Sequence, residues 1–256
     1  MRRWIGVVAV AACLTGCAAQ QVDSGAAASE ADSQGHERAK VFTDLAGAYL
    51  SRGQYKVALD ELRKAITADS RFGPAYNVYG MIYMDLGEDQ LAEENFRRAI
   101  DLNHNDSDTR NNYGWFLCTR GRYDEGLAQF TAALRNPLYT QPELAMANAG
   151  LCAEKKGDIA LAEANLSKSL KLQPDNAGTL LKLAGLYYRQ GRLQEAQRQL
   201  ARHDELAPPS AASLWLGVLL ERKLGDRAQE TAYAAQLRKR FPDSNEAQRL
   251  MSGQFE

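Results

Sequence analysis

From about residue 39 to the end of the chain, apolar residues return every three or four positions, which is the spacing of helices with one buried face. The runs are short, and each closes at a glycine or a proline. Glycine ends a helix because it readily adopts a left-handed backbone, and proline ends one because it lacks a backbone N–H. The pattern therefore predicts an all-α protein built from pairs of short helices. The prolines that end the second helix of a pair are Pro137, Pro174, Pro208 and Pro242.

The helix pairs repeat along the chain. The segment "YLSRGQYKVAL" at Tyr49 aligns with "YYRQGRLQEAQ" at Tyr187 and with four other segments. The spacings between the aligned glycines are 34, 34, 36, 34 and 34 residues. This period resembles that of the tetratricopeptide repeat, in which each unit is a helix–turn–helix. The aligned glycines are Gly53, Gly87, Gly121, Gly157, Gly191 and Gly225.

This resemblance implies a right-handed superhelical solenoid of six repeats, closed by a short C-terminal capping helix. The one 36-residue spacing places an insertion around Asn136–Leu144, between the third and fourth repeats. Gly126 departs from the repeat pattern, because alanine is usual at its position in the second helix. The repeats are expected at residues 39–72, 73–106, 107–142, 143–176, 177–210 and 211–242, and the cap at residues 243–256.

The first residues have the pattern of a secretory signal. Arg2 and Arg3 precede an apolar run from Ile5 to Leu14, which is shorter than the roughly 20 residues that span a bilayer. The run ends in Leu14-Thr15-Gly16-Cys17, which resembles a bacterial lipobox. The resemblance implies that residues 1–16 are cleaved and that Cys17 carries lipid. The alternative is an ordinary signal peptide with a chance cysteine.

The lipid would anchor the protein to a membrane. Each buried CH₂ contributes ~0.8 kcal/mol, so the two or three chains of a bacterial lipoprotein hold far more firmly than one. By resemblance to sorted lipoproteins, Ala18 favours the periplasmic face of the outer membrane, reached through the lipoprotein sorting machinery. Residues 17–38 contain one valine and no aromatic residue, and we expect them to form a flexible tether that reaches roughly 25 Å.

The composition excludes several classes of function. Charged residues make up 25% of the chain and the net charge is −1, so nothing indicates binding to nucleic acid. His36, His104 and His203 are expected in the tether, in a turn and late in a helix, where no two share a face that would hold a metal. We find no glycine-rich phosphate loop and no nucleophile elbow. We expect neither catalysis nor a cofactor, although an unrecognised catalytic site is an alternative that the lack of clustered titratable residues disfavours.

Two cysteines remain after the signal and its lipobox. Cys118 and Cys152 fall near the ends of the first helices of the third and fourth repeats, which lie side by side in such a solenoid. The compartment outside the inner membrane is oxidising, and a bridge that closes about 34 residues contributes roughly 3.5–4 kcal/mol on the chain-entropy model. We favour a disulfide, and the alternative is two unpaired buried cysteines.

The first helices of the repeats line the concave face of such a solenoid. We expect positions two, five, nine and twelve of these helices to face inward, and many of them carry Met, Trp, Tyr or Leu. Exposed apolar patches generally mark binding sites, so we predict a protein-binding groove in which asparagines add hydrogen bonds to the ligand backbone. The alternative is that some of these residues pack between repeats or under the tether. The candidate groove residues are Asn77, Met81, Met84, Asn111, Asn112, Trp115, Leu151, Leu181, Tyr188, Trp215 and Leu219.

Three motifs in the middle of the chain are more specific than the repeat itself. They are "NNYGWFLC" at Asn111, "PLY" at Pro137 and "NAGLC" at Asn148. They resemble motifs of the PilF/PilW family of type IV pilus biogenesis lipoproteins. The resemblance spans all six repeats, and the lipobox belongs to it.

The family resemblance implies an outer-membrane lipoprotein that acts as a pilotin. Such proteins help the secretin subunit of the type IV pilus to reach the outer membrane and to assemble into a ring, and they are needed for surface pili and twitching motility. We expect a monomer whose groove holds a segment of the secretin while the lipid supplies the destination. The alternative is a general scaffold lipoprotein that docks cell-wall enzymes or other envelope complexes.

Overall fold

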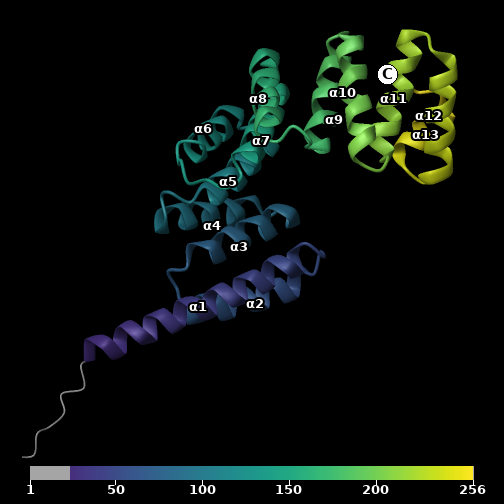
Figure 1. Ribbon diagram of the computed structural model, residues 1–256. Helices are drawn as coiled ribbons and strands as arrows, with labels where there is room; N and C mark the ends of the chain where they lie inside the picture. The colour runs from purple at the N-terminus through teal and green to yellow at the C-terminus, as the bar shows by residue number, and fades with distance from the viewer. Residues whose placement is uncertain (1–23, 256) are drawn as a thin grey trace, which may run out of the picture.

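The structure, a computed structural model, describes residues 24–255, with side chains from residue 32 onward. This part of the chain contains thirteen α-helices and no strand, so the all-α fold expected from the sequence is confirmed (Figure 1). The helices are α1 (Ser24–Leu50), α2 (Tyr55–Ala68), α3 (Gly73–Leu86), α4 (Asp89–Leu102), α5 (Ser107–Thr119), α6 (Tyr123–Ala133), α7 (Pro142–Lys156), α8 (Ile159–Leu172), α9 (Ala177–Arg189), α10 (Leu193–Leu206), α11 (Ala211–Leu224), α12 (Arg227–Arg240) and α13 (Asn245–Ser252).

Consecutive helices form six helix–turn–helix units, from α1 with α2 to α11 with α12, and α13 follows the last unit. The first helix of each unit contacts its own partner and also the first helix of the next unit, so α3, α5 and α7 lie side by side. Figure 1 shows the units stacked in one continuous curved array, with α1 at one end and α13 at the other. This is the solenoid that the 34-residue period predicts.

Glycines and polar side chains set the ends of the helices. Gly87 ends α3 and Gly225 ends α11 with φ of 77° and 82°, a left-handed backbone that residues with a Cβ rarely adopt. At the other end of a helix, the Asp106 carboxylate accepts a hydrogen bond from Thr109 N at 3.0 Å and so caps the start of α5. These residues determine where each helix ends and the next one begins, so that successive helices can fold back and pack on one another.

The repeats pack by placing small residues of first helices against large residues of second helices. Phe96 in α4 and Phe130 in α6 are fully buried and lie against Gly80 and Gly114. A Cβ at Gly80 would come within 2.7 Å of Phe96 Cδ1, so the ring requires a glycine there. The core therefore consists of several small, close-packed clusters of buried residues that follow one another along the solenoid.

α1 begins at Ser24, so residues 24–38, which were expected to belong to the flexible tether, are helical in the structure. This segment is rich in alanine, which favours a helix, and its last turns pack on the first repeat. His36 Nδ1 lies 3.0 Å from Asp69 Oδ2, and the imidazole meets the Phe72 ring edge-on with the centroids 4.9 Å apart. His36 therefore belongs to the first repeat.

The signal peptide expected at residues 1–16 and the lipid attachment expected at Cys17 lie outside the described residues. Within residues 24–255, no helix combines the length and the apolar composition that crossing a membrane requires.

Candidate protein-binding surfaces

The candidate groove residues lie on the adjacent first helices α3 to α11, and none of them is freely exposed. Met81 and Met84 pack against the buried cluster that contains Phe96. Trp115 packs against the cluster that contains the two cysteines, and Lys155 Nζ lies 5.7 Å from the centroid of its ring. These side chains therefore stabilise the repeats as well as line the concave face. The partly buried members are Asn77, Met81, Met84, Asn112, Trp115, Leu151, Leu181, Tyr188 and Leu219.

Trp215 does not line an open groove. Its side chain is 7% exposed, and its ring stacks on Phe255 with the centroids 5.8 Å apart. The Arg249 guanidinium lies 4.9 Å from the centroid of the Trp215 ring. Helical position alone predicted an inward-facing tryptophan, whereas the C-terminal segment folds back and covers it.

The asparagines of the concave face bond to one another. Asn148 Nδ2 donates to Asn111 Oδ1 at 3.0 Å, and Asn111 Nδ2 donates to the neighbouring Asn112 Oδ1 at 3.4 Å. Asn112 Nδ2 in turn donates to Asn77 Oδ1 at 3.1 Å. The amides thus link α7, α5 and α3, and Asn111 is buried, so much of their hydrogen-bonding capacity is used within the protein. Asn148 was not a candidate, although its place 36 residues after Asn112 repeats the pattern.

Cys118 and Cys152 form a disulfide between α5 and α7, with their Cα atoms 5.6 Å apart. The bridge explains the unusual glycine in α6. A Cβ at Gly126 would collide with Cys118 Sγ and come within 2.7 Å of the carbonyl oxygen of Gly114. The departure from the usual alanine therefore makes room for the disulfide.

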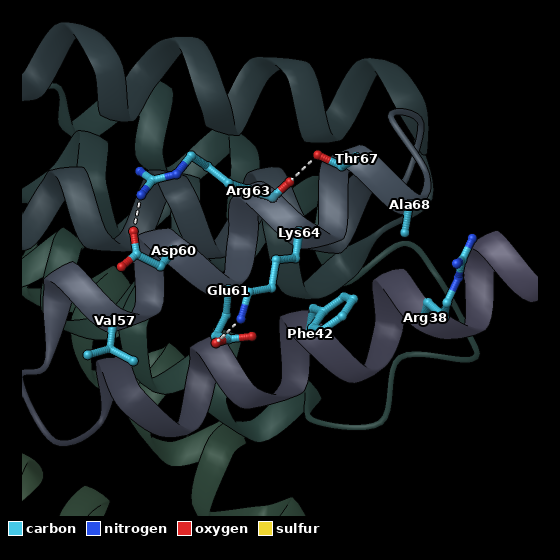
Figure 2. Close-up of a pocket in the computed structure, with 9 residues that line it drawn as sticks. All are labelled: Arg38, Phe42, Val57, Asp60, Glu61, Arg63, Lys64, Thr67 and Ala68. Carbon is cyan, nitrogen blue, oxygen red and sulfur yellow. Dashed lines mark hydrogen bonds and ion pairs between the residues drawn. The ribbon is translucent and has the colours of Figure 1, made fainter.

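A second surface, which the sequence did not single out, lies between α1 and α2 at the N-terminal end of the solenoid (Figure 2). It is a hollow of about 790 Å³. On the same face of α1, Val41 is 58% exposed and Leu45 is 39% exposed. We call the hollow with these two residues the end surface. The hollow is lined by Arg38, Phe42, Val57, Asp60, Glu61, Arg63, Lys64, Thr67 and Ala68.

Four of the five charged side chains that line the hollow of the end surface form two neutral pairs. Arg63 pairs with Asp60, and Lys64 Nζ lies 2.7 Å from Glu61 Oε1, as Figure 2 shows. The Lys64 ammonium also lies 5.7 Å from the centroid of the Phe42 ring. Arg38, the third cation at the hollow, makes no ion pair within the described residues, so the surface offers a partner both apolar contact and one unpaired positive charge. The sequence did not reveal it because the hollow is formed by side chains of two separate helices.

Several of the described titratable residues form ion pairs that link neighbouring repeats. Arg122 Nη1 lies 2.7 Å from Glu93 Oε2, and this hydrogen bond holds the pKa of Glu93 below its usual range. The Tyr113 hydroxyl donates to Glu93 at 2.9 Å. His104 lies in the turn before α5, and His203 is buried with Nδ1 3.0 Å from the carbonyl oxygen of residue 177. In residues 24–255 no three ligating side chains come together.

Comparison with known proteins agrees with this architecture. Profiles of the tetratricopeptide repeat match residues 73–106, 95–128, 117–177, 153–217 and 211–244. The stacked helix pairs and these matches define a tetratricopeptide-repeat protein.

Two relatives narrow the assignment. The structure of PilW, described as a widely conserved type IV pilus biogenesis factor, is 33% identical and superposes with a TM-score of 0.77, covering 83% of this chain and 98% of PilW. The type IV pilus assembly protein PilF of Pseudomonas aeruginosa is 28% identical over 240 residues, which are 93% of this chain and 94% of PilF. The structure of that PilF superposes with a TM-score of 0.74. The chain therefore belongs to the PilF/PilW family of non-enzymatic, protein-binding type IV pilus biogenesis proteins.

Proposed function

We propose that this protein is an outer-membrane lipoprotein that acts as a pilotin for the type IV pilus. It binds the secretin subunit, accompanies it to the outer membrane and promotes its multimerisation, and so it supports pilus formation and twitching motility. The observation that carries the proposal is membership of the PilF/PilW family along nearly the whole length of PilW. The lipobox that ends at Cys17 adds the membrane destination.

We place the secretin contact on the end surface rather than along the concave groove. The groove asparagines are engaged with one another, and Trp215 is covered by the C-terminal segment. On the end surface, Val41 and Leu45 are exposed beside a hollow that has no preceding repeat among the described helices. Exposed apolar side chains next to a hollow favour binding of a protein segment. The lipid-bearing N-terminus and the cargo would then lie at the same end of the solenoid.

The experiment that tests the proposal replaces Cys17 with serine and follows the secretin by membrane fractionation. Cys13→Ser is the matched control, because that cysteine is expected to leave with the signal peptide. We expect Cys17→Ser to deplete secretin multimers from the outer membrane and Cys13→Ser to leave them unchanged. Normal multimers in the outer membrane of cells carrying Cys17→Ser would contradict the pilotin function. If cell-wall enzymes rather than the secretin then copurified with the protein, the general scaffold lipoprotein would replace it.

A further inference from the structure

A second hollow, of about 400 Å³, lies where the insertion between the third and fourth repeats meets the starts of α3 and α5. Its walls come from two adjacent repeats: Pro74 and Asn77 from α3, the turn that precedes α5, and the loop between α6 and α7. The loop is present because of the 36-residue spacing, which no other pair of adjacent repeats has. The hollow is distinct from the end surface, which lies on α1 and α2.

The hollow is acidic and holds no basic partner for its acids. Asp106 and Asp108 line it, and Glu143 lies close by in the first turn of α7. The Asp106 carboxylate accepts from Thr109 N at 3.0 Å and from Thr109 Oγ1 at 2.6 Å. Asp108 is exposed and makes no ion pair or side-chain hydrogen bond within the described part of the chain, and partial desolvation, followed by the neighbouring Asp106, raises the pKa of its carboxyl. Asp108 stands in the first turn of α5, where the helix dipole favours a carboxylate, and no lysine or arginine lines the hollow beside it.

A buried hydroxyl among these acids also lacks a partner. Tyr139 lines the hollow and is 9% exposed, yet its hydroxyl makes no hydrogen bond within residues 24–255. Its pKa is raised first by burial and then by Asp108, Glu143 and Asp106, so the hydroxyl lies within reach of their charges. A buried polar atom without a hydrogen bond destabilises a protein and therefore requires an explanation. A ligand that donates hydrogen bonds and carries positive charge would satisfy the phenolic oxygen and the carboxylate together.

The loop beside the hollow is held in place while it exposes an apolar side chain. Asn136 Nδ2 donates to the carbonyl oxygen of Asn105 at 3.2 Å and to Ser107 Oγ at 3.1 Å. Asn136 Oδ1 accepts from Leu138 N at 3.0 Å. These bonds fix the loop, although the Leu138 side chain is 84% exposed. The Leu138 side chain is therefore outside the core and free to contact a ligand that enters the hollow.

The chemistry of the ligand follows from these groups. The described residues contain no set of three ligating side chains for a metal, and we therefore consider an organic cation. A guanidinium is planar and carries five N–H donors, which suits acceptors spread across a hollow of this size better than a compact ammonium does. We propose that the hollow receives an arginine side chain from an extended segment of a partner protein, and that an apolar residue beside this arginine packs on Leu138. The proposal does not depend on the secretin assignment above.

Binding of short peptides to the folded chain tests the proposal directly. The protein is the mature chain with Cys17→Ser, and backbone amide shifts are followed by NMR. The probe is acetyl-leucyl-arginine amide, and acetyl-leucyl-citrulline amide is the neutral control of the same shape. We expect the arginine peptide to shift amides at residues 105–109 and 138–141 and to bind about ten-fold more tightly than the citrulline peptide, because charge-assisted hydrogen bonds are the stronger ones. Equal affinity for the two peptides, or shifts confined to other repeats, would overturn the proposal.

Variants assign the roles of the residues. Asp108→Asn is expected to weaken the arginine peptide about ten-fold, whereas Asp101→Asn, which removes an exposed carboxylate on α4 outside the hollow, leaves binding unchanged. Tyr139→Phe is expected to weaken binding and to raise the melting temperature, because it removes the unsatisfied hydroxyl. Leu138→Ser should weaken acetyl-leucyl-arginine amide but not acetyl-glycyl-arginine amide. Unchanged affinity in a folded Asp108→Asn protein would remove the site.

Discussion

The two ends of the solenoid are built from the same repeat but are finished differently. At the C-terminal end, α13 and Phe255 cover α11, so that Trp215 is buried and Leu250 packs in the same cluster. At the N-terminal end, α1 and α2 leave Val41, Leu45 and Val57 exposed around a hollow. One end is closed by the protein's own chain and the other presents apolar side chains to solvent.

This difference shows that an open end is not a necessary outcome of stacking repeats. A terminal repeat usually needs a polar outer face or a cap to keep its apolar side from water. The C-terminal end has such a cap, since Arg222 and Arg249 place their guanidinium groups over the Phe255 and Trp215 rings. Over the described N-terminal helices the structure has no equivalent cover, and four predictions test this contrast between the two ends.

The largest effect on stability is expected when the closed end is opened. Trp215→Ala removes a buried aromatic side chain and should lower the free energy of unfolding by about 3–5 kcal/mol. Hydrogen exchange should show that α11 to α13 lose protection while α1 and α2 keep theirs, because each repeat contacts only its neighbours. Trp115→Ala is the control. Because the Trp115 side chain is only partly buried, this variant should lower the free energy of unfolding by less than Trp215→Ala does. An equal loss of protection at both ends would contradict the local role of the cap.

The next largest effect on stability is expected from loss of the disulfide between α5 and α7, in the middle of the solenoid. Replacing Cys118 and Cys152 together by alanine removes the link between α5 and α7 and should cost about 3.5–4 kcal/mol on the chain-entropy model. Exchange protection should fall most in α5 to α8. Mass spectrometry of the unreduced protein checks the starting state, in which two free thiols per mature chain would contradict the disulfide.

A smaller effect is expected from one added methyl group beside the disulfide. Gly126→Ala should destabilise the protein by about 1–3 kcal/mol, because the new Cβ meets Cys118 Sγ and the carbonyl oxygen of Gly114. In a protein that also carries Cys118→Ala and Cys152→Ala, the sulfur is gone and the cost should fall. Thermal or urea unfolding is measured for the parent protein, for Gly126→Ala, for the double cysteine variant and for the variant with all three changes. The difference between the two costs of Gly126→Ala is the coupling free energy between the methyl group and the disulfide. Equal costs in both backgrounds would show that the sulfur does not exclude alanine.

The smallest effect on stability is expected at the open end. Leu45→Asp replaces a side chain that is 39% exposed, so the free energy of unfolding should change by no more than about 0.5 kcal/mol. Leu91→Asp, at a leucine of the same exposure on α4, should change it equally little. Circular dichroism during urea unfolding measures both. A loss of several kcal/mol for Leu45→Asp would mean that this leucine belongs to the core instead of a binding surface.

The fold could be predicted because its signals are local. The glycines at a 34-residue period fix the turns, and the small residues opposite Phe96 and Phe130 fix how the two helices of a repeat approach. The three family motifs indicated a type IV pilus biogenesis protein, and the similarity to PilW and PilF agrees with this. The motifs could do so because they are more specific than the general tetratricopeptide pattern. The helical start of α1 was missed because composition alone does not show that His36 packs on Phe72.

The candidate site was predicted less well because exposure depends on distant parts of the chain. Position in a helix indicates that Trp215 faces inward, but only the folded tail shows that Phe255 covers it. Likewise, the sequence places asparagines on one face of the helices. Only the structure shows that Asn112 forms a hydrogen bond with Asn77. The end surface and the insertion hollow are formed by separate segments, so no single motif marks them.

The central claim is that the open end of the solenoid holds the secretin, and the most direct measurement compares secretin capture by two variants of equal exposure. The mature chain with Cys17→Ser, immobilised and folded, is tested alone, with Leu45→Asp and with Leu91→Asp. We predict that Leu45→Asp lowers the affinity for the secretin subunit at least about ten-fold, because burying an unpaired carboxylate against an apolar partner is costly. Leu91→Asp should bind as the parent does. Equal affinity of both variants for the secretin would contradict the claim.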